Sequence, residues 1–270
     1  MQWCLVFLLS LFSHSALAAP FTTGIFDIEI KDSLDVLVKT EQGDVLWISP
    51  YKKSLIELIQ RAKFQNSLVE LESDQDHFII NARLLDEKFH SEELALEYDS
   101  SEFEPTIFTN YNNLRRSFLT MRRDSRKNSQ CYERAYVWAY DLWETQEINS
   151  MKLFLFFTNK YIREYRFKWW YHVSPMSYLG EQEYVLDRKF ARGPLYPQTW
   201  TNIFMRNNAV CKSVVSYFDY DKDDPTESCF LIRSSMHYLG PNALKRRDQG
   251  FELTKWNLTT LRNSRRRGFH

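Results

Sequence analysis

Short runs in which apolar and polar residues alternate dominate the first third of the chain, and one helical pattern interrupts them. A period of two places successive side chains on opposite faces, as in a half-buried strand. Between residues 54 and 64 the apolar positions instead recur at the spacing of one helix face. We expect a small α+β domain over residues 19–105, with strands at 25–30, 34–39, 45–48, 68–71 and 78–80. This domain has no cysteine and no glycine-rich phosphate loop, so we predict no chemistry for it.

A second helical pattern begins at Cys131, and its apolar face continues through Trp143. Asn128 or Ser129 can cap the N-terminus of this helix. The cysteine then falls in the first turn, where free backbone N–H groups and the helix dipole stabilise a thiolate relative to a thiol. The same N–H groups can donate to an oxyanion that forms on a carbonyl attacked by the sulfur. Cys131 is therefore the candidate nucleophile.

The N-terminus predicts an export signal. The apolar run from Cys4 to Phe12 has the length of a signal-peptide core and is too short for a membrane span. The sequence Ala16-Leu17-Ala18 offers small residues for cleavage before Ala19, although no Lys or Arg precedes the apolar run. No later stretch is apolar enough to span a bilayer. We expect a signal peptide at residues 1–18 and a secreted or periplasmic protein.

Cleavage there removes Cys4 and leaves three cysteines. In an oxidising compartment an odd count predicts one disulfide and one free thiol. Cys211 and Cys229 bracket a polar loop with strand-like flanks, so we expect these two to form the disulfide. Cys131 then remains as the free thiol.

Charge is divided unequally, although the net charge of the chain is zero. Residues 19–105 hold 19 acidic and 8 basic residues, a balance of −11, and residues 106–270 hold 16 and 27, a balance of +11. Such asymmetry suggests two units that attract each other, or independent drift of surface charge. An acidic, loop-like stretch covers 87–104.

A basic segment follows at 106–127, and we expect it to be a linker. It is a candidate processing site, at which a trypsin-like protease would release the second unit, or alternatively the solvated face of a helix. Neither this segment nor Arg265-Arg266-Arg267 lies in a nucleic-acid recognition motif. We therefore expect no nucleic-acid partner.

A nucleophilic cysteine needs a base, and His172 and His237 are the candidates in the second half of the chain. The sequence after His172 favours it. Leu179-Gly180 predicts a two-residue hairpin loop, after which residues 183–187 continue as a strand. This register places Asp187 directly opposite His172 on the same face. A carboxylate beside an imidazole fixes its tautomer and stabilises the imidazolium, as a Cys-His-Asp triad requires.

Several motifs resemble those of the bacterial protein-glutaminases, the protein-glutamine deamidases. The run Cys131-Tyr132-Glu133-Arg134-Ala135 is similar to the Cys-x-x-Arg-Ala start of that family's central helix. Residues 170–175 and 184–187 resemble its histidine and aspartate strands, and the resemblance covers roughly residues 130–244. It extends through Pro194-Leu195, Trp200, Cys211, Cys229, Met236-His237-Tyr238 and Pro241. The chain departs from the family at Tyr136, Arg188 and Leu239, where His, Pro and Trp are usual, and these positions bear on the substrate preference rather than on the triad.

The resemblance implies an α+β fold of the transglutaminase and papain-like kind, in which a Cys-bearing helix packs on an antiparallel sheet. It implies hydrolysis of the side-chain amide of protein-bound glutamine to glutamate and ammonia, in a catalytic domain at 128–270. Cys131 would be the nucleophile, His172 the base and acid, and Asp187 the orienting carboxylate. Family members carry an N-terminal pro-segment that blocks the cleft, and residues 19–105 suit that role as an intramolecular inhibitor.

The same triad serves other reactions. An amine in place of water makes the enzyme a transglutaminase, and acceptance of main-chain amides makes it a cysteine peptidase. A vestigial triad would leave a secreted binding module. We expect no cofactor and no metal, because the remaining His and Cys lack zinc-ligand spacing and the acidic loop 219–224, a weak candidate for Ca²⁺, does not fit the EF-hand pattern.

Overall fold

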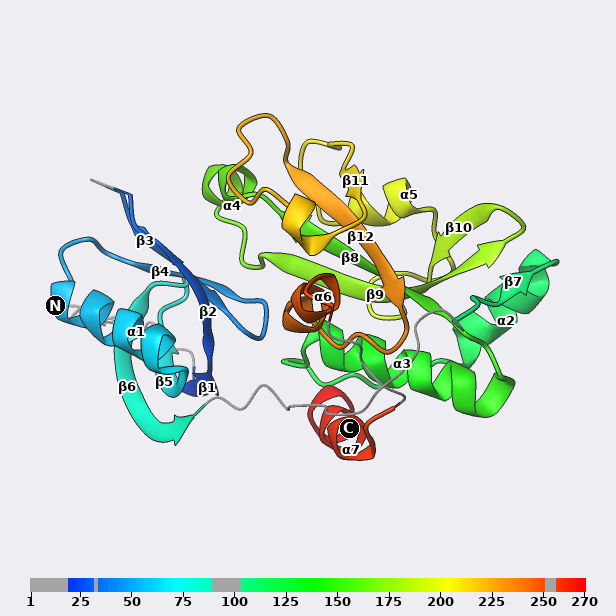
Figure 1. The fold of residues 1–270 in the computed structure, drawn as a ribbon, viewed down its shortest axis with the longest axis horizontal. Coiled ribbons are helices and arrows are strands. Elements are labelled where there is room, and N and C mark those ends of the chain that lie inside the picture. The colour runs from blue at the N-terminus through cyan, green and yellow to red at the C-terminus, as the bar shows by residue number, and fades with distance from the viewer. Residues whose placement is uncertain (1–18, 32–33, 89–102, 251–255) are drawn as a thin grey trace, which may run out of the picture. The chain divides into compact units, whose positions relative to one another are not determined.

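The computed structural model describes residues 19–31, 34–88, 103–250 and 256–270 (Figure 1). The expected signal peptide and most of the expected acidic loop lie outside these residues. The chain divides into two compact units, of which the first comprises Met1–Thr40 and Leu46–Phe89. The second comprises Glu41–Val45 and His90–His270. In the described part of the chain, no helix is both long and apolar enough to cross a membrane.

The first unit contains two three-stranded sheets and a helix, α1 (Lys53–Gln65). Ile59 and Ala62 form the buried face of α1 and pack in an apolar core with residues from both sheets. The α+β pattern read from the sequence is present, with an additional strand at the N-terminus and longer strands at 67–73 and 79–88. One sheet has the order β2 (Ile25–Glu29), β3 (Val36–Thr40), β4 (Val45–Ile48), and the other β1 (Phe21–Thr23), β5 (Ser67–Ser73), β6 (Ile79–Lys88).

The second unit is built on one six-stranded sheet of order β10-β9-β8-β12-β11, with a short β7 paired to β9. Strands β10, β9, β8 and β12 are antiparallel to one another in turn, whereas β7 and β11 run parallel to their neighbours. The sheet is therefore mainly antiparallel, as expected. The strands are β7 (Ile107–Phe108), β8 (Met151–Phe157), β9 (Tyr171–Leu179), β10 (Gln182–Val185), β11 (Lys212–Val214) and β12 (Cys229–Ser235).

Helix α3 (Cys131–Gln146) packs on β9, and α7 (Leu258–Gly268) packs on α3 (Figure 1). The middle of α3 is buried almost all round, because the sheet covers one side and other helices cover the rest. A helix that is enclosed in this way can be apolar on most of its faces. The fold is thus the expected one, a Cys-bearing helix on a mainly antiparallel sheet. The remaining α-helices of the described residues are α2 (Tyr111–Thr120), α4 (Asn159–Tyr165), α5 (Pro197–Thr201) and α6 (Pro241–Asp248).

The segment 106–127 is not the basic linker that we expected, because it contains β7 and α2. Leu114 and Phe118 of α2 are fully buried in the same apolar core as α3. The adjacent Arg115 and Arg116 are exposed, so the helix is amphipathic. The many arginines of this segment made it read as a basic linker, although one face of the helix is apolar. Release of the second unit by cleavage within 122–127 would remove α2 from this core.

Candidate active site

Cys131 is the first residue of α3, and its side chain is partly exposed. The N-terminal N–H groups of a helix have no intrahelical acceptors, and Cys131 lies in this first turn. The predicted side-chain cap was wrong, because Gln130 occupies the cap position with extended backbone and makes no side-chain cap bond. The Ser129 hydroxyl instead donates to the Arg126 carbonyl (2.8 Å) and accepts from Nη1 of Arg134 (2.8 Å).

His172 lies on β9, and its ring is almost completely buried. Its Nε2 is 2.8 Å from Oδ2 of Asp187. Burial by itself lowers the pKa of His172, but hydrogen bonds to Asp187 and Cys131 and the negative charge of both raise it to about 9. Since Nε2 is engaged by Asp187, Nδ1 is the ring nitrogen left for the cysteine.

Asp187 lies two residues beyond the end of β10, and its carboxylate accepts four hydrogen bonds. Oδ2 accepts from His172 and, at 2.9 Å, from Nε1 of Trp200. Oδ1 accepts from the backbone N–H groups of Lys189 (3.1 Å) and Phe190 (3.3 Å). Burial raises the pKa of Asp187, but the bonds from His172 and Trp200 and the charges of His172 and Arg134 outweigh it, so the net pKa is lowered. The carboxylate is therefore ionised although it is buried.

The hairpin register that we predicted was wrong by two positions. Gln182 pairs with Leu179 and Val185 with Met176, so the loop is Gly180-Glu181 rather than Leu179-Gly180. The residue opposite Asp187 would then be Ser174, two positions along the strand from His172. A shift of two keeps both residues on one face of the sheet, which is why the inference of a shared face survives. Asp187 reaches His172 diagonally from the end of the strand.

Aromatic rings enclose the His172 imidazole. Trp169 stacks on it with centroids 5.8 Å apart and planes at 18°, and Phe204 lies 4.6 Å away. Phe190 and Trp200 close the remaining sides at 5.3 and 5.5 Å. These apolar walls hold the ring in place and weaken dielectric screening of its bond to Asp187.

Sequence reasoning missed the roles of Trp200 and Arg134. Trp200 comes from α5, and no spacing rule joins that helix to the end of β10. Arg134 is buried one turn after Cys131, and its guanidinium also donates to the Ser129 carbonyl. Burial lowers the pKa of Arg134, whereas the charges of Cys131 and Asp187 raise it. This guanidinium thus braces the segment before the cysteine and supplies positive charge to the site.

Residues Glu41–Val45, which belong to the second unit, lie along the segment that leads into β9. The Gly43 carbonyl accepts from the Trp170 N–H (3.0 Å), and the Val45 N–H donates to the Lys168 carbonyl (2.8 Å). Gly43 has a φ of +97°, and an added Cβ would be 2.9 Å from Cε1 of Tyr171. The Glu41 carboxylate accepts from the Asn242 amide (2.7 Å). Burial raises the pKa of Glu41 to about 7 and that of Asp44 to about 6.

The other candidates read from the sequence lie elsewhere. Cys211 and Cys229 form a disulfide, and Cys131 is the free cysteine of the described residues. His237 packs against Trp256 and Phe103 rather than against the cysteine. Within the described ranges, no group of three or more His, Cys, Asp or Glu side chains is placed to bind a metal, and this includes the acidic loop 219–224.

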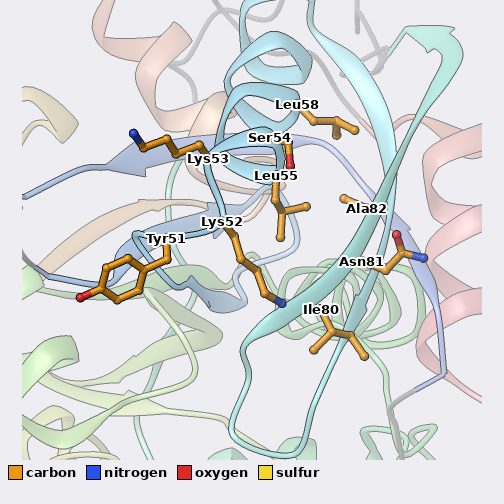
Figure 2. A pocket seen from close by; sticks show the side chains of 9 residues that line it. All are labelled: Tyr51, Lys52, Lys53, Ser54, Leu55, Leu58, Ile80, Asn81 and Ala82. Carbon is orange, nitrogen blue, oxygen red and sulfur yellow. The ribbon is translucent and has the colours of Figure 1, made fainter.

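A depression of about 520 Å³ lies in the first unit between α1 and β6 (Figure 2). Its lining consists of one tyrosine and of lysine, small polar and aliphatic side chains, and it contains neither a carboxylate nor a histidine nor a cysteine. We assign it no chemistry. The lining residues are Tyr51, Lys52, Lys53, Ser54, Leu55, Leu58, Ile80, Asn81 and Ala82.

Comparison with known proteins gives a family match over part of the chain and a shared fold. Residues 108–204 match the model of a family described as glutaminase. The structure is similar to a pro-protein-glutaminase with a TM-score of 0.54 and 14% identity, over 90% of each chain. It is also similar to the A47Q2 mutant of pro-protein-glutaminase, with a TM-score of 0.51 and 14% identity, over 81% of this chain and 83% of that one. No curated protein sequence is significantly similar to this chain. The family match and the shared fold are together consistent with membership of the protein-glutaminase family.

Proposed function

We propose that this protein is an exported protein-glutamine deamidase that hydrolyses the side-chain amide of protein-bound glutamine to glutamate and ammonia. The observation that carries the proposal is the buried His172, hydrogen-bonded at Nε2 to Asp187, in hydrogen-bonding reach of the cysteine that starts α3. In the proposed triad, Cys131 is the nucleophile, His172 is the base, and Asp187 is the carboxylate that orients the imidazole. The glutaminase family match over 108–204 contains all three residues and directs the proposal to a glutamine amide.

In the first half of the reaction, the Cys131 thiolate attacks the carbonyl carbon of the carboxamide. Backbone N–H groups at the start of α3 stabilise the resulting oxyanion. His172 then donates its proton to the nitrogen, the C–N bond breaks, and ammonia leaves a thioester on the sulfur. In the second half, neutral His172 takes a proton from water, which attacks the thioester. Glutamate departs and the thiolate is restored.

The electrostatics of the site suit these proton transfers. Because the pKa of His172 is raised to about 9, the imidazole is protonated at neutral pH. The pKa of Asp187 is lowered, so it supplies a full negative charge behind the imidazolium. His172 therefore holds the proton that the leaving amide nitrogen needs.

We further propose that residues 19–105 act as an intramolecular inhibitor through their segment Glu41–Val45, which belongs to the second compact unit. Residues Glu41–Val45 hydrogen-bond along residues 168–170, two residues before the catalytic histidine. A peptide substrate that approaches His172 would compete for the same backbone groups. The disulfide Cys211–Cys229 supports export to an oxidising compartment, as does the apolar N-terminal run of the sequence.

Deamidation is tested by intact-mass analysis of a glutamine-containing protein incubated with this chain. The incubation is run before and after limited digestion with a glutamate-specific protease, which has several sites between Glu87 and Glu104. The expected product gains about one mass unit per converted glutamine, because a carboxylic acid replaces the amide. Ammonia should appear in equal amount, and Cys131→Ala should abolish both signals.

The same assay separates the alternatives. Incorporation of an added primary amine in place of the mass gain would identify a transglutaminase. New N-termini would identify a peptidase. Full activity of Cys131→Ala would overturn the triad, and absence of activity with every amide substrate would favour a binding module.

A further inference from the structure

Two basic segments from separate parts of the chain meet beside the triad. One is 122–127, which ends four residues before Cys131, and the other is 188–192, which starts directly after Asp187. The Lys189 ammonium donates to the Ser125 hydroxyl at 2.8 Å, which joins the two segments. The Arg188 guanidinium lies 4.9 Å from the Phe118 ring, and its pKa is lowered by burial and by the charge of Arg123. We call this surface, made of residues 122–127 and 188–192, the basic rim.

The basic rim is strongly unbalanced in charge. It holds seven Lys and Arg residues against a single acidic residue, Asp124. Partners satisfy some of these cations, since Arg122 pairs with Asp141 (3.4 Å) and Arg126 donates to the Phe269 carbonyl (2.8 Å). Arg123, Lys127 and Arg192 are exposed and make no hydrogen bond or ion pair with another residue in the described ranges. Three cations are therefore available to an incoming ligand.

The rim is placed where a substrate must pass. The N–H groups of Lys189 and Phe190 bond the Asp187 carboxylate, so the loop that bears the cations is held against the triad. The Phe190 ring packs on His172, while the other segment leads into the start of α3. A polypeptide that presents its glutamine to Cys131 must lay its neighbouring residues across one or both segments.

We propose that the basic rim selects acidic protein substrates, in which Asp or Glu residues flank the reactive glutamine. This proposal rests on the proposed deamidase function and names its substrate class. Cations at the edge of a reactive site attract an oppositely charged ligand and raise its association rate, and salt screens that attraction. Because Arg123, Lys127 and Arg192 come from two loops, they can contact acidic residues on both sides of one glutamine.

The test compares kcat/KM for glutamine peptides that are identical except for flanking Glu, Ser or Lys residues, measured with the enzyme preparation that deamidates proteins. At low ionic strength we expect the Glu-flanked peptide to be favoured over the Ser-flanked one by about tenfold, and the Lys-flanked one to be the poorest. The preference should shrink to about twofold in 0.5 M salt, because the Debye length falls to roughly 4 Å.

A matched pair of variants locates the effect. The double variant Arg123→Gln with Arg192→Gln removes one cation from each segment and should lose most of the preference while keeping kcat for the Ser-flanked peptide. The control, Lys160→Gln with Lys212→Gln, removes the same charge from exposed residues of α4 and β11. It should keep the preference.

Equal kcat/KM for the three peptides, or an equal loss in both double variants, would overturn the inference alone. Absence of deamidation with all peptides would overturn the proposed function and this inference with it. Binding of a fluorescent single-stranded RNA that is lost in Arg123→Gln with Arg192→Gln, without any peptide preference, would assign the rim to nucleic acid instead.

Discussion

His172 and Asp187 are joined by a contact of 2.8 Å between Nε2 and Oδ2, and each side chain is almost completely buried. Neither would carry its charge in such a place alone, because burial opposes ionisation of both. Together they reverse that effect, so that the pKa of His172 is raised and that of Asp187 is lowered. The pair is thus the electrostatic centre of the candidate site.

Asp187→Asn should lower kcat/KM at pH 8 by about 10²- to 10⁴-fold. The negative charge of Asp187 helps to raise the pKa of His172 to about 9. Its loss lets that pKa fall, so the imidazolium deprotonates at lower pH and the alkaline limb of the pH–rate profile moves toward acid. The profile of kcat/KM measures this shift. The control is Glu181→Gln, in the exposed loop of the same hairpin, which should leave the alkaline limb of the profile unchanged. An unchanged alkaline limb in Asp187→Asn would contradict the triad.

Trp200→Phe should weaken the same carboxylate by removing a different hydrogen bond to it. It removes the donor that is 2.9 Å from Oδ2 of Asp187 but keeps an aromatic ring in the buried position. One hydrogen bond to a charged group contributes about 1.5 kcal/mol or more, so the pKa of Asp187 should rise, the acid limb should move to higher pH, and kcat should fall by about tenfold.

Trp138→Phe is the matched control for Trp200→Phe. The buried Trp138 indole donates to the Arg122 carbonyl at 2.9 Å, away from the carboxylate. This variant should lose comparable stability in a denaturant titration and keep the acid limb. If both variants shift the limb equally, the Trp200 bond has no specific role.

Gly43→Ala should raise the activity of the undigested chain. A methyl group at this position would come within 2.9 Å of a Tyr171 ring carbon and should loosen residues Glu41–Val45. Gly180→Ala is the control, since Gly180 also has a positive φ of +59° but nothing lies within 4 Å of an added Cβ. Both changes carry a backbone strain of about 1 kcal/mol. An assay of latent activity distinguishes them, and equal activities would argue against inhibition by this segment.

Removal of the disulfide should weaken the fold without changing the chemistry. Cys211 and Cys229 are 18 residues apart in sequence, and a loop of this size corresponds to about 3 kcal/mol of unfolding free energy. In the double alanine variant, the denaturant midpoint should fall while kcat of the folded protein is kept, because neither cysteine contacts the triad. Cys131→Ala should show the reverse result, with full stability and no activity. A loss of kcat in the double variant would mean that β12 helps to position the site.

Local pattern in the sequence was sufficient to predict several features. The spacing of apolar residues indicated α1, α3 and most strands, because helix and strand periods depend only on neighbours along the chain. The odd number of cysteines indicated the disulfide and the free Cys131. The parity of the hairpin put His172 and Asp187 on one face even though the register itself was wrong by two positions. A helix within 106–127 was expected only as the alternative to a processing site, and its short buried face was missed because charged residues outnumber the apolar ones there.

Tertiary packing determined the contacts between residues that are far apart in the sequence. Four features depend on how loops pack around the sheet. They are the hydrogen bond from Trp200 to Asp187, the bonds from Arg134 to Ser129, the aromatic rings around His172, and the contact of 122–127 with 188–192. No period or spacing encodes such contacts, since they arise from the shape and charge of surfaces that form only when the chain has folded. By itself, the sequence determined which residues could perform the chemistry and which face they share. Their protonation states and the approach to them depend on burial and on partners far along the chain, which exist only in the folded unit.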